Sequence, residues 1–333
     1  MSGINRVRDI IRKLYRDYGG YITAAGKFLT ALILFLQINI ITGGTGLFSS
    51  FFVILILALF CSFLPDNAII VTGTTAAIAQ LVSVSAAAAA VGGSLLLIVL
   101  LLYFSFAPKQ AWAFLLAFLA VSLHIPCIIP LAFGLMGTPL SVVGIIAGTV
   151  VYYTLAAIGG AGAAEVPLAM AGTEEAVFSE IRRLTLAVLQ EQEMILMLIA
   201  LLAVFVVVYF ARRMAMDHAW AVAIASGTVI YLVLMAAGWM MLEMDTGIVW
   251  ILLGTLLSVL TAVLLEVFFF HLDYRRKEKV QFEDDDYYYY VKAIPKISVS
   301  QTEMNTVKLN AGKKTAKAGT ARKKVINSQD DEE

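Results

Sequence analysis

Helix-breaking residues and an ionisable side chain occur together in HIPCIIPLAFGLMGTP, residues 124 to 139. Pro126, Pro130 and Gly134 are spaced so as to share one helix face, and Gly137 follows them. Each proline lacks the backbone donor that the helical ladder needs, so carbonyls are left free. In hydrocarbon, free carbonyls are tolerated only against protein or in a wet cavity. The stretch therefore predicts a broken-helix site on a substrate pathway, with His124 beside it as a titratable group.

A purely structural interpretation of this stretch stays open. The prolines would then form a simple kink whose glycines allow close helix contact, and His124 would be a neutral imidazole bonded to a carbonyl. Glu266 lies one turn from the end of the last apolar segment, where we expect it to reach water. The isolated polar residues Gln37, Asn39 and Gln80 are expected to bridge helices by hydrogen bonds.

Enzyme motifs are missing from the sequence. The run GGYITAAGKFLT resembles a phosphate-binding loop, but its spacing is one residue too long, and Phe28 stands where Ser or Thr would hold magnesium. Cys61 and Cys127 lie in apolar segments, and no Cys/His cluster has metal-ligand spacing. We expect neither enzymatic activity nor a cofactor or metal.

A second unusual stretch, VQFEDDDYYYYVKAIPK, follows the last apolar segment. Residues 279 to 283 and 286 to 294 are predicted to form a β-hairpin that turns at the aspartates, because Tyr, Val and Phe favour strands. The hairpin is a candidate docking element for a cytoplasmic protein, or a short ordered cap on the helices. The docking candidates are Asp284, Asp285, Asp286, Tyr287, Tyr288, Tyr289 and Tyr290.

The elements that must position these stretches are membrane helices, because 60% of residues are hydrophobic and only 14% are charged. Residues 68 to 106 are predicted to form a hairpin turning near Ser83 to Ser85, and residues 110 to 138 a compressed or re-entrant pair. The clear spans are 24 to 41, 47 to 63, 141 to 158, 194 to 211, 218 to 240 and 248 to 270.

Arginine and lysine clusters before the first span, after Tyr209 and after the last span predict that both termini are cytoplasmic. This requires ten membrane segments, or eight full spans if one hairpin is re-entrant. Residues 4 to 18 are amphipathic and expected on the inner leaflet. The external loop at 159 to 193 is expected to hold an amphipathic helix. Its apolar face comprises Val177, Ile181, Leu184 and Val188.

The predicted fold is therefore an all-α polytopic transmembrane helix bundle of about 8–10 membrane segments, one or two possibly re-entrant, with a short β-prone cytoplasmic tail. Four regions follow: a cytoplasmic amphipathic helix (1–20), a transmembrane domain (21–271), a tyrosine-rich juxtamembrane segment (272–298) and a low-complexity tail expected to be disordered (299–333).

The stretch FEDDDYYYYVKAIPK, together with MDHAWAVAIASGT at 216 to 228 and HIPCIIPLAFGLMG, resembles a family of uncharacterised multi-spanning bacterial membrane proteins. The resemblance covers roughly residues 5 to 298. It implies the same layout and a bacterial plasma membrane, and it carries no established activity.

The expected function is that of a transporter-like or permease-like component with its broken-helix site on the pathway. The rival is a membrane anchor or scaffold that recruits a cytoplasmic partner through the tyrosine-rich segment. Expected partners are the lipid bilayer, a cytoplasmic protein or separate ATPase subunit, and a second copy of the chain. Lys and Arg equal Asp and Glu at 24 each, so nothing indicates nucleic acid binding.

Overall fold

The structure is a computed structural model that describes residues 2–43, 50–162, 174–214, 218–242, 247–269, 278–283 and 288–293. The chain divides into two compact units, Met1–Phe269 and Phe270–Glu333. The candidates Asp284, Asp285, Asp286 and Tyr287 lie outside the described residues, as does the whole of the predicted tail, 299–333.

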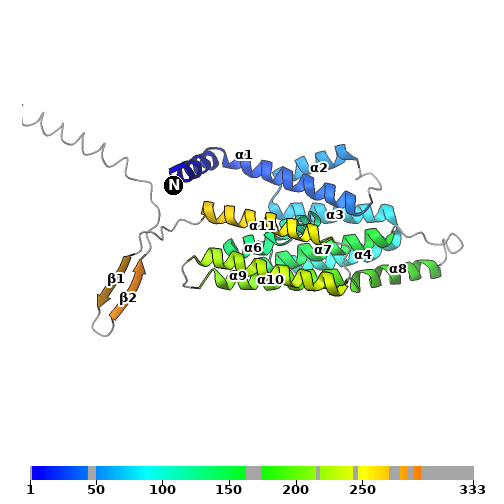
Figure 1. The fold of residues 1–333 in the computed structure, drawn as a ribbon. Coiled ribbons are helices and arrows are strands. Elements are labelled where there is room, and N and C mark those ends of the chain that lie inside the picture. The colour runs from blue at the N-terminus through cyan, green and yellow to red at the C-terminus, as the bar shows by residue number, and fades with distance from the viewer. Residues whose placement is uncertain are drawn as a thin grey trace, which may run out of the picture. The chain divides into compact units, whose positions relative to one another are not determined.

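The first unit is helical throughout its described residues, and its helices lie side by side as a bundle (Figure 1). Within the described residues, seven helices are long and apolar enough to cross a membrane. The all-α polytopic fold is thus confirmed, and the chain is a multi-pass membrane protein. Its helices are α1 (Ser2–Ile41), α2 (Phe51–Phe63), α3 (Asp66–Val84), α4 (Ala86–Phe106), α5 (Ala111–Ser122), α6 (Ile128–Met136), α7 (Ser141–Gly162), α8 (Glu174–Leu189), α9 (Gln192–Ala211), α10 (Ala219–Leu242) and α11 (Ile248–Phe269).

Helix α1 is kinked at Tyr18, where the backbone leaves helical geometry. The kink coincides with the end of the amphipathic stretch predicted for residues 4 to 18. The first candidate span, Arg16–Ile41, begins two residues before the kink. Helix α2 has 13 residues and is shorter than a typical span. The turn predicted near Ser83 to Ser85 is confirmed, because α3 ends at Val84 and α4 begins at Ala86.

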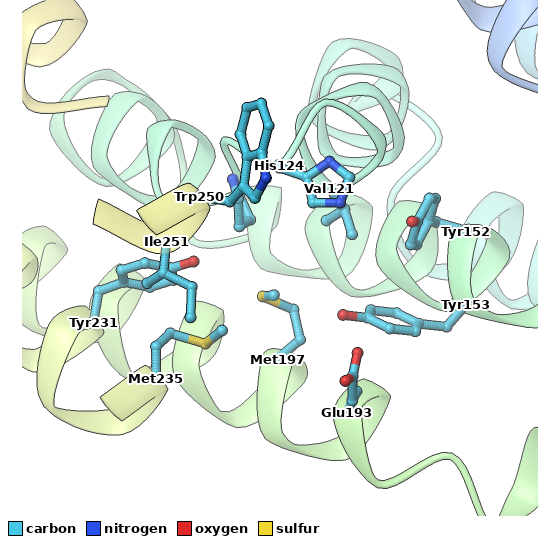
Figure 2. A pocket seen from close by; sticks show the side chains of 11 residues that line it. Val121, His124, Tyr152, Tyr153, Glu193, Met197, Tyr231, Met235, Trp250 and Ile251 are labelled. Carbon is cyan, nitrogen blue, oxygen red and sulfur yellow. The ribbon is translucent and has the colours of Figure 1, made fainter. Parts of the chain in front are cut away.

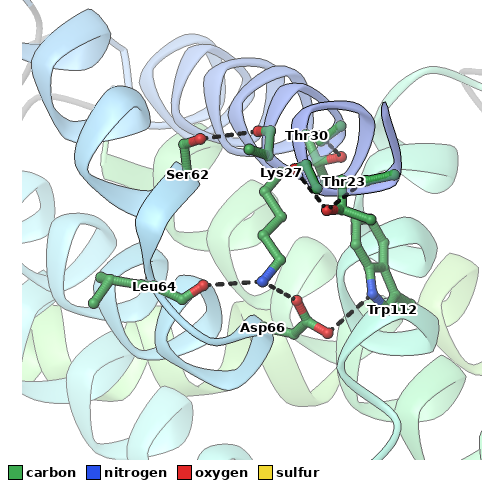
Figure 3. A network of polar contacts seen from close by, with 11 residues as sticks. Thr23, Lys27, Thr30, Ser62, Leu64, Asp66 and Trp112 are labelled. Atoms are coloured by element: carbon green, nitrogen blue, oxygen red, sulfur yellow. Dashed lines mark hydrogen bonds and ion pairs between the residues drawn. The ribbon is translucent and has the colours of Figure 1, made fainter. Parts of the chain in front are cut away.

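A polar network joins α1 to the α2–α3 connection and to α5 (Figure 3). The Lys27 ammonium lies 2.9 Å from an Asp66 carboxylate oxygen and donates a hydrogen bond to the Leu64 carbonyl at 3.1 Å. The other Asp66 oxygen accepts a bond from the Trp112 indole at 3.1 Å. We call this end of the bundle the Lys27 end. The contacts pin three helices there, since each partner comes from a different element.

The opposite end of the bundle is held by contacts of Thr42 and Ser85. The Thr42 hydroxyl donates to the Gln80 side-chain oxygen at 2.6 Å, and the Ser85 hydroxyl donates to Glu180 at 2.8 Å. We call it the Glu193 end, after the acid in the first turn of α9. Among the described residues, seven helices are long enough to run between the two ends, and α2 is shorter. The seven are α1, α3, α4, α7, α9, α10 and α11. Helix α1 leaves the Lys27 end and α11 returns to it (Figure 1).

Gln37 and Gln80 accept hydrogen bonds that join different helical segments, as predicted. Gln37 accepts a bond from Ser122 of α5 at 2.8 Å, and Gln80 of α3 accepts the bond from Thr42 at the end of α1. The buried Asn39 side-chain oxygen has no partner among the described residues. Glu266, in the last turns of α11, is half-buried and interacts electrostatically with His218.

Helices α5 and α6 form a re-entrant hairpin that begins and ends at the Lys27 end. Gln110, before α5, donates to Thr138 at 3.1 Å and accepts from Ser141 at 2.9 Å, so both ends of the hairpin meet. The 12 residues of α5 extend about 18 Å, against a hydrocarbon core of about 30 Å. The hairpin therefore turns back inside the bundle, which agrees with the compressed or re-entrant pair predicted for residues 110 to 138.

Glycines of α7 allow it to approach α5 closely. A Cβ atom added to Gly148 would overlap the Phe114 carbonyl, and one added to Gly144 would lie 2.9 Å from the Ala113 Cβ and 3.0 Å from the Gln110 carbonyl. Such contacts are too short for any larger residue. The small faces predicted between residues 134 and 148 therefore serve helix packing.

Two arginines follow α9 at the Lys27 end. The Arg213 guanidinium lies 3.4 Å from the ring centre of Tyr209, and that of Arg212 lies 5.5 Å from the ring of Trp220. Partial burial lowers the pKa of Arg212, and the adjacent charge of Arg213 lowers that pKa further. Arg212 remains a cation, since an arginine pKa begins far above neutrality.

The amphipathic helix predicted within 173 to 193 is present as α8. Leu184 and Val188 are buried and Ile181 is half-buried, as expected for an apolar face. The inclusion of Val177 in that face is wrong, since 48% of it is exposed. The helix packs on α4 and α7.

The second unit contains an antiparallel hairpin of β1 (Glu278–Glu283) and β2 (Tyr288–Ala293). Its register pairs Phe282 with Tyr289 and Val280 with Val291. The strands agree with the predicted arms, and three of the docking candidates, Tyr288, Tyr289 and Tyr290, begin β2.

Candidate functional site

The turn between α5 and α6 has an unusual residue at its centre. The His124 N–H donates to the Val121 carbonyl at 3.1 Å and the Ile125 N–H donates to the Ala120 carbonyl at 2.8 Å. This pair of bonds forms a Schellman motif, whose central residue is left-handed and is usually glycine. His124 occupies that position with φ of +59°. A residue with a Cβ atom is thus held in the left-handed conformation at the tip of the hairpin, and this conformation costs backbone energy.

Helix α11 approaches the tip through a glycine. A Cβ atom added to Gly254 would overlap the His124 carbonyl oxygen, so only glycine fits there. One turn earlier in α11, the Trp250 ring centre lies 6.4 Å from that of His124. The irregular backbone of the turn is therefore covered by α11 and does not face lipid at this point.

A cavity of about 60 Å³ lies between the tip and the surrounding helices (Figure 2). Its volume has room for about four to six waters, at roughly 10–15 Å³ each. We call it the tip pocket. Side chains from the hairpin, α7, α9, α10 and α11 line it: Val121, His124, Pro126, Tyr152, Tyr153, Glu193, Met197, Tyr231, Met235, Trp250 and Ile251.

The lining of the tip pocket combines one carboxylate with aromatic rings and thioethers. Glu193 is half-buried, and Figure 2 shows its carboxylate directed toward the Tyr153 hydroxyl. Tyr153 and Tyr231 are 8% and 2% exposed, so their rings form an inner wall. Trp250 is 62% exposed and lies at the rim with His124. The pocket therefore runs from an exposed aromatic rim to a buried interior.

The predicted site residues do not all reach this pocket. His124 and Pro126 line it. Pro130 is buried in the first turn of α6, and a Cβ atom added to Gly134 would lie 2.7 Å from Val208 of α9, so this glycine serves packing. Gly137 follows the last residue of α6, where its N–H donates to a carbonyl one turn back at 2.7 Å.

The prediction that the two prolines share a face of one helix is wrong. Pro126 lies in the turn before α6, and Pro130 is its third residue. Helix N–H groups in the first turn have no intrahelical partner, so Pro130 removes no ladder bond. The helix is interrupted at residues 123 to 127 because α5 ends in the left-handed residue His124.

Nine of the eleven lining residues were not predicted from the sequence: Val121, Tyr152, Tyr153, Glu193, Met197, Tyr231, Met235, Trp250 and Ile251. Glu193 falls within the predicted external loop at 159 to 193, although it lies in the first turn of an apolar helix. An acidic residue at the start of an apolar helix was the sequence signal that could have identified Glu193 as a site residue. The aromatic residues gave none, since their common depth depends on how three helices are offset along the bundle.

No group of three or more His, Cys, Asp or Glu side chains in the described part of the chain is arranged to hold a metal ion. Neither a protein-family model, nor a curated protein, nor a solved structure matches the chain.

Proposed function

We propose that the protein moves a small solute across a bacterial plasma membrane, along a route that includes the tip pocket. The observation that carries this proposal is the re-entrant hairpin, whose tip ends at a cavity inside the bundle. Backbone that leaves helical geometry at membrane depth is typical of transporter and channel sites, where it meets protein or water.

The dimensions of the hairpin support a pathway. From the Lys27 end, α5 extends about 18 Å into a core of about 30 Å, so the tip divides the thickness unequally. The pocket lies on the far side of the tip, beside the first turn of α9. A solute at this site has a short remaining distance to the Glu193 end, and the packed hairpin separates it from the Lys27 end.

Charge supports a direction for this layout. Lys13, Arg16, Arg212 and Arg213 belong to the Lys27 end or to the helix that leads into it, and positive flanks favour the cytoplasmic side. In this proposal the Lys27 end is cytoplasmic, both termini are cytoplasmic, and the tip pocket is reached from outside. Any ATP-driven step would belong to a separate subunit.

A pair of glycine variants tests the proposal. Gly254→Ala forces a Cβ atom onto the His124 carbonyl and displaces the tip, whereas Gly160→Ala, in α7, meets nothing within 4 Å. Overpacking costs about 1–3 kcal/mol, enough to lower the initial transport rate by about tenfold if the tip must keep its position.

The measurement uses purified protein in proteoliposomes with radiolabelled choline, glutamate, glucose and glycine, which sample a cation, an anion, a neutral solute and a zwitterion. We expect at least one solute to exchange faster than in protein-free vesicles, in wild type and Gly160→Ala but not in Gly254→Ala. Exchange of none of these solutes, or equal rates in both variants, would refute the proposal.

A second candidate function, recruitment of a cytoplasmic protein, is favoured by the hairpin Glu278–Ala293. A two-stranded hairpin is marginal alone and gains stability when a partner adds a strand. Deletion of residues 278–293 should then remove a specific protein from pull-downs while transport continues. An unchanged set of co-purified proteins would reject recruitment.

A further inference from the structure

We infer that the tip pocket binds a small organic cation, of the size and chemistry of an alkylammonium head group. The inference rests on the proposed function, because it names the solute class that the same pocket would accept. Its basis is the meeting of one carboxylate with four aromatic rings around a small cavity.

The charge of the lining favours a cation over an anion. Among the described residues that line the pocket, Glu193 is the one acidic side chain, and neither Lys nor Arg is present. Glu193 is the second residue of α9, where the helix dipole stabilises a carboxylate in its charged form. A negative charge in a partly buried pocket attracts a positive solute more strongly than it would in water.

The aromatic lining favours an organic cation over a metal ion. Tyr152 and Tyr153 come from α7, Tyr231 from α10 and Trp250 from α11, so ring faces and edges surround the cavity on several sides (Figure 2). Aromatic rings attract alkylammonium groups through their negative faces. Calcium and magnesium instead require several oxygen ligands, which one carboxylate does not supply.

The size of the pocket also limits the size of the organic cation that it can bind. The pocket is small, so a compact head group such as trimethylammonium suits it better than a large polycyclic cation, which would have to displace buried Tyr153 and Tyr231. Met197 and Met235 complete the wall with flexible thioethers, which adapt to methyl groups. Together these observations point to a methylated amine such as choline as the first probe.

The experiment compares choline with its uncharged isostere, 3,3-dimethylbutan-1-ol, on purified full-length protein in lipid nanodiscs. Binding is followed by isothermal titration calorimetry. The two probes have the same shape and differ in charge, so the comparison isolates the electrostatic contribution. We expect saturable binding of choline, and binding of the isostere weaker by about tenfold or more.

Variants at two neighbouring acids supply the matched control. Glu193→Gln removes the charge that lines the pocket, and Glu191→Gln removes one that lies two residues earlier and does not line it. We expect choline affinity to fall by about tenfold in the first and by less than about twofold in the second. Trp250→Leu should also weaken choline, because it removes a ring from the rim.

Three results would overturn the inference: no saturable choline binding, equal affinity for the two probes, or a Glu193→Gln variant that binds choline like wild type. Should Glu193→Gln fail to fold, the comparison of the two probes on wild type decides. Transport of another solute that still depends on Gly254 would refute the cation class and leave the proposed function standing. Charge-dependent choline binding without transport of any solute would support the cation class and refute the proposed function.

Discussion

Replacement of His124 by glycine should stabilise the protein relative to replacement by alanine. Both changes remove the imidazole and its contact with Trp250. They differ in the backbone, because the φ of +59° at this position is accessible to glycine and strained for alanine. The comparison of the two variants therefore isolates the backbone energy stored at the tip.

The expected difference is about 1 kcal/mol. The left-handed conformation costs a residue with a Cβ atom about 1–2 kcal/mol, and the greater freedom of glycine in the unfolded chain offsets part of this. For a protein of this size, the difference corresponds to roughly 2–4 °C in Tm. Thermal unfolding in detergent, followed by tryptophan fluorescence, measures this difference. We expect the glycine variant to have a higher Tm than the alanine variant.

A helical position serves as the control. Val82 is an exposed residue of α3, where alanine should be more stable than glycine by about 1 kcal/mol, so the order of the two variants reverses. Equal Tm values for the His124 variants, or alanine above glycine, would show that the tip does not hold the left-handed geometry in the protein. The explanation of the helix interruption would then fail.

Further predictions concern the bundle and the tail. In a double-mutant cycle, Lys27→Met and Asp66→Asn should show a coupling of about 1 kcal/mol in unfolding free energy, and additive effects would contradict the ion pair at 2.9 Å. Gly148→Ala should lower unfolding free energy by about 1–3 kcal/mol and Gly160→Ala should not, which denaturant titration of both variants checks. Deletion of residues 278–293 should leave the Tm of the bundle unchanged, because these residues belong to a separate unit.

Sequence reasoning was most successful where one physical quantity decides the structure. Apolar stretches of sufficient length must become helices in lipid, so α7, α9, α10 and α11 begin and end within a few residues of their predicted spans. The irregular segment 110 to 138 was also interpreted correctly, because it is too long for one span and too short for two.

The tip pocket was less accessible to sequence reasoning because its residues meet only through helix offsets. Tyr153, Tyr231 and Trp250 lie in three helices and have no common motif. The prolines correctly indicated a helix break at this turn, but they do not cause it, since the interruption comes from the left-handed His124. The nearest sequence signal to the site was an acid, Glu193, at the start of an apolar helix.

The covering of the tip by Gly254 has a consequence for biosynthesis. The hairpin is translated well before α11, and chains mature from the N-terminus as they leave the ribosome. Until α11 is made, the peptide groups around His124 lack the neighbour that covers them. A nascent polypeptide stopped short of residue 248 would thus have an uncovered hairpin turn, so synthesis of α11 completes the packing of the tip.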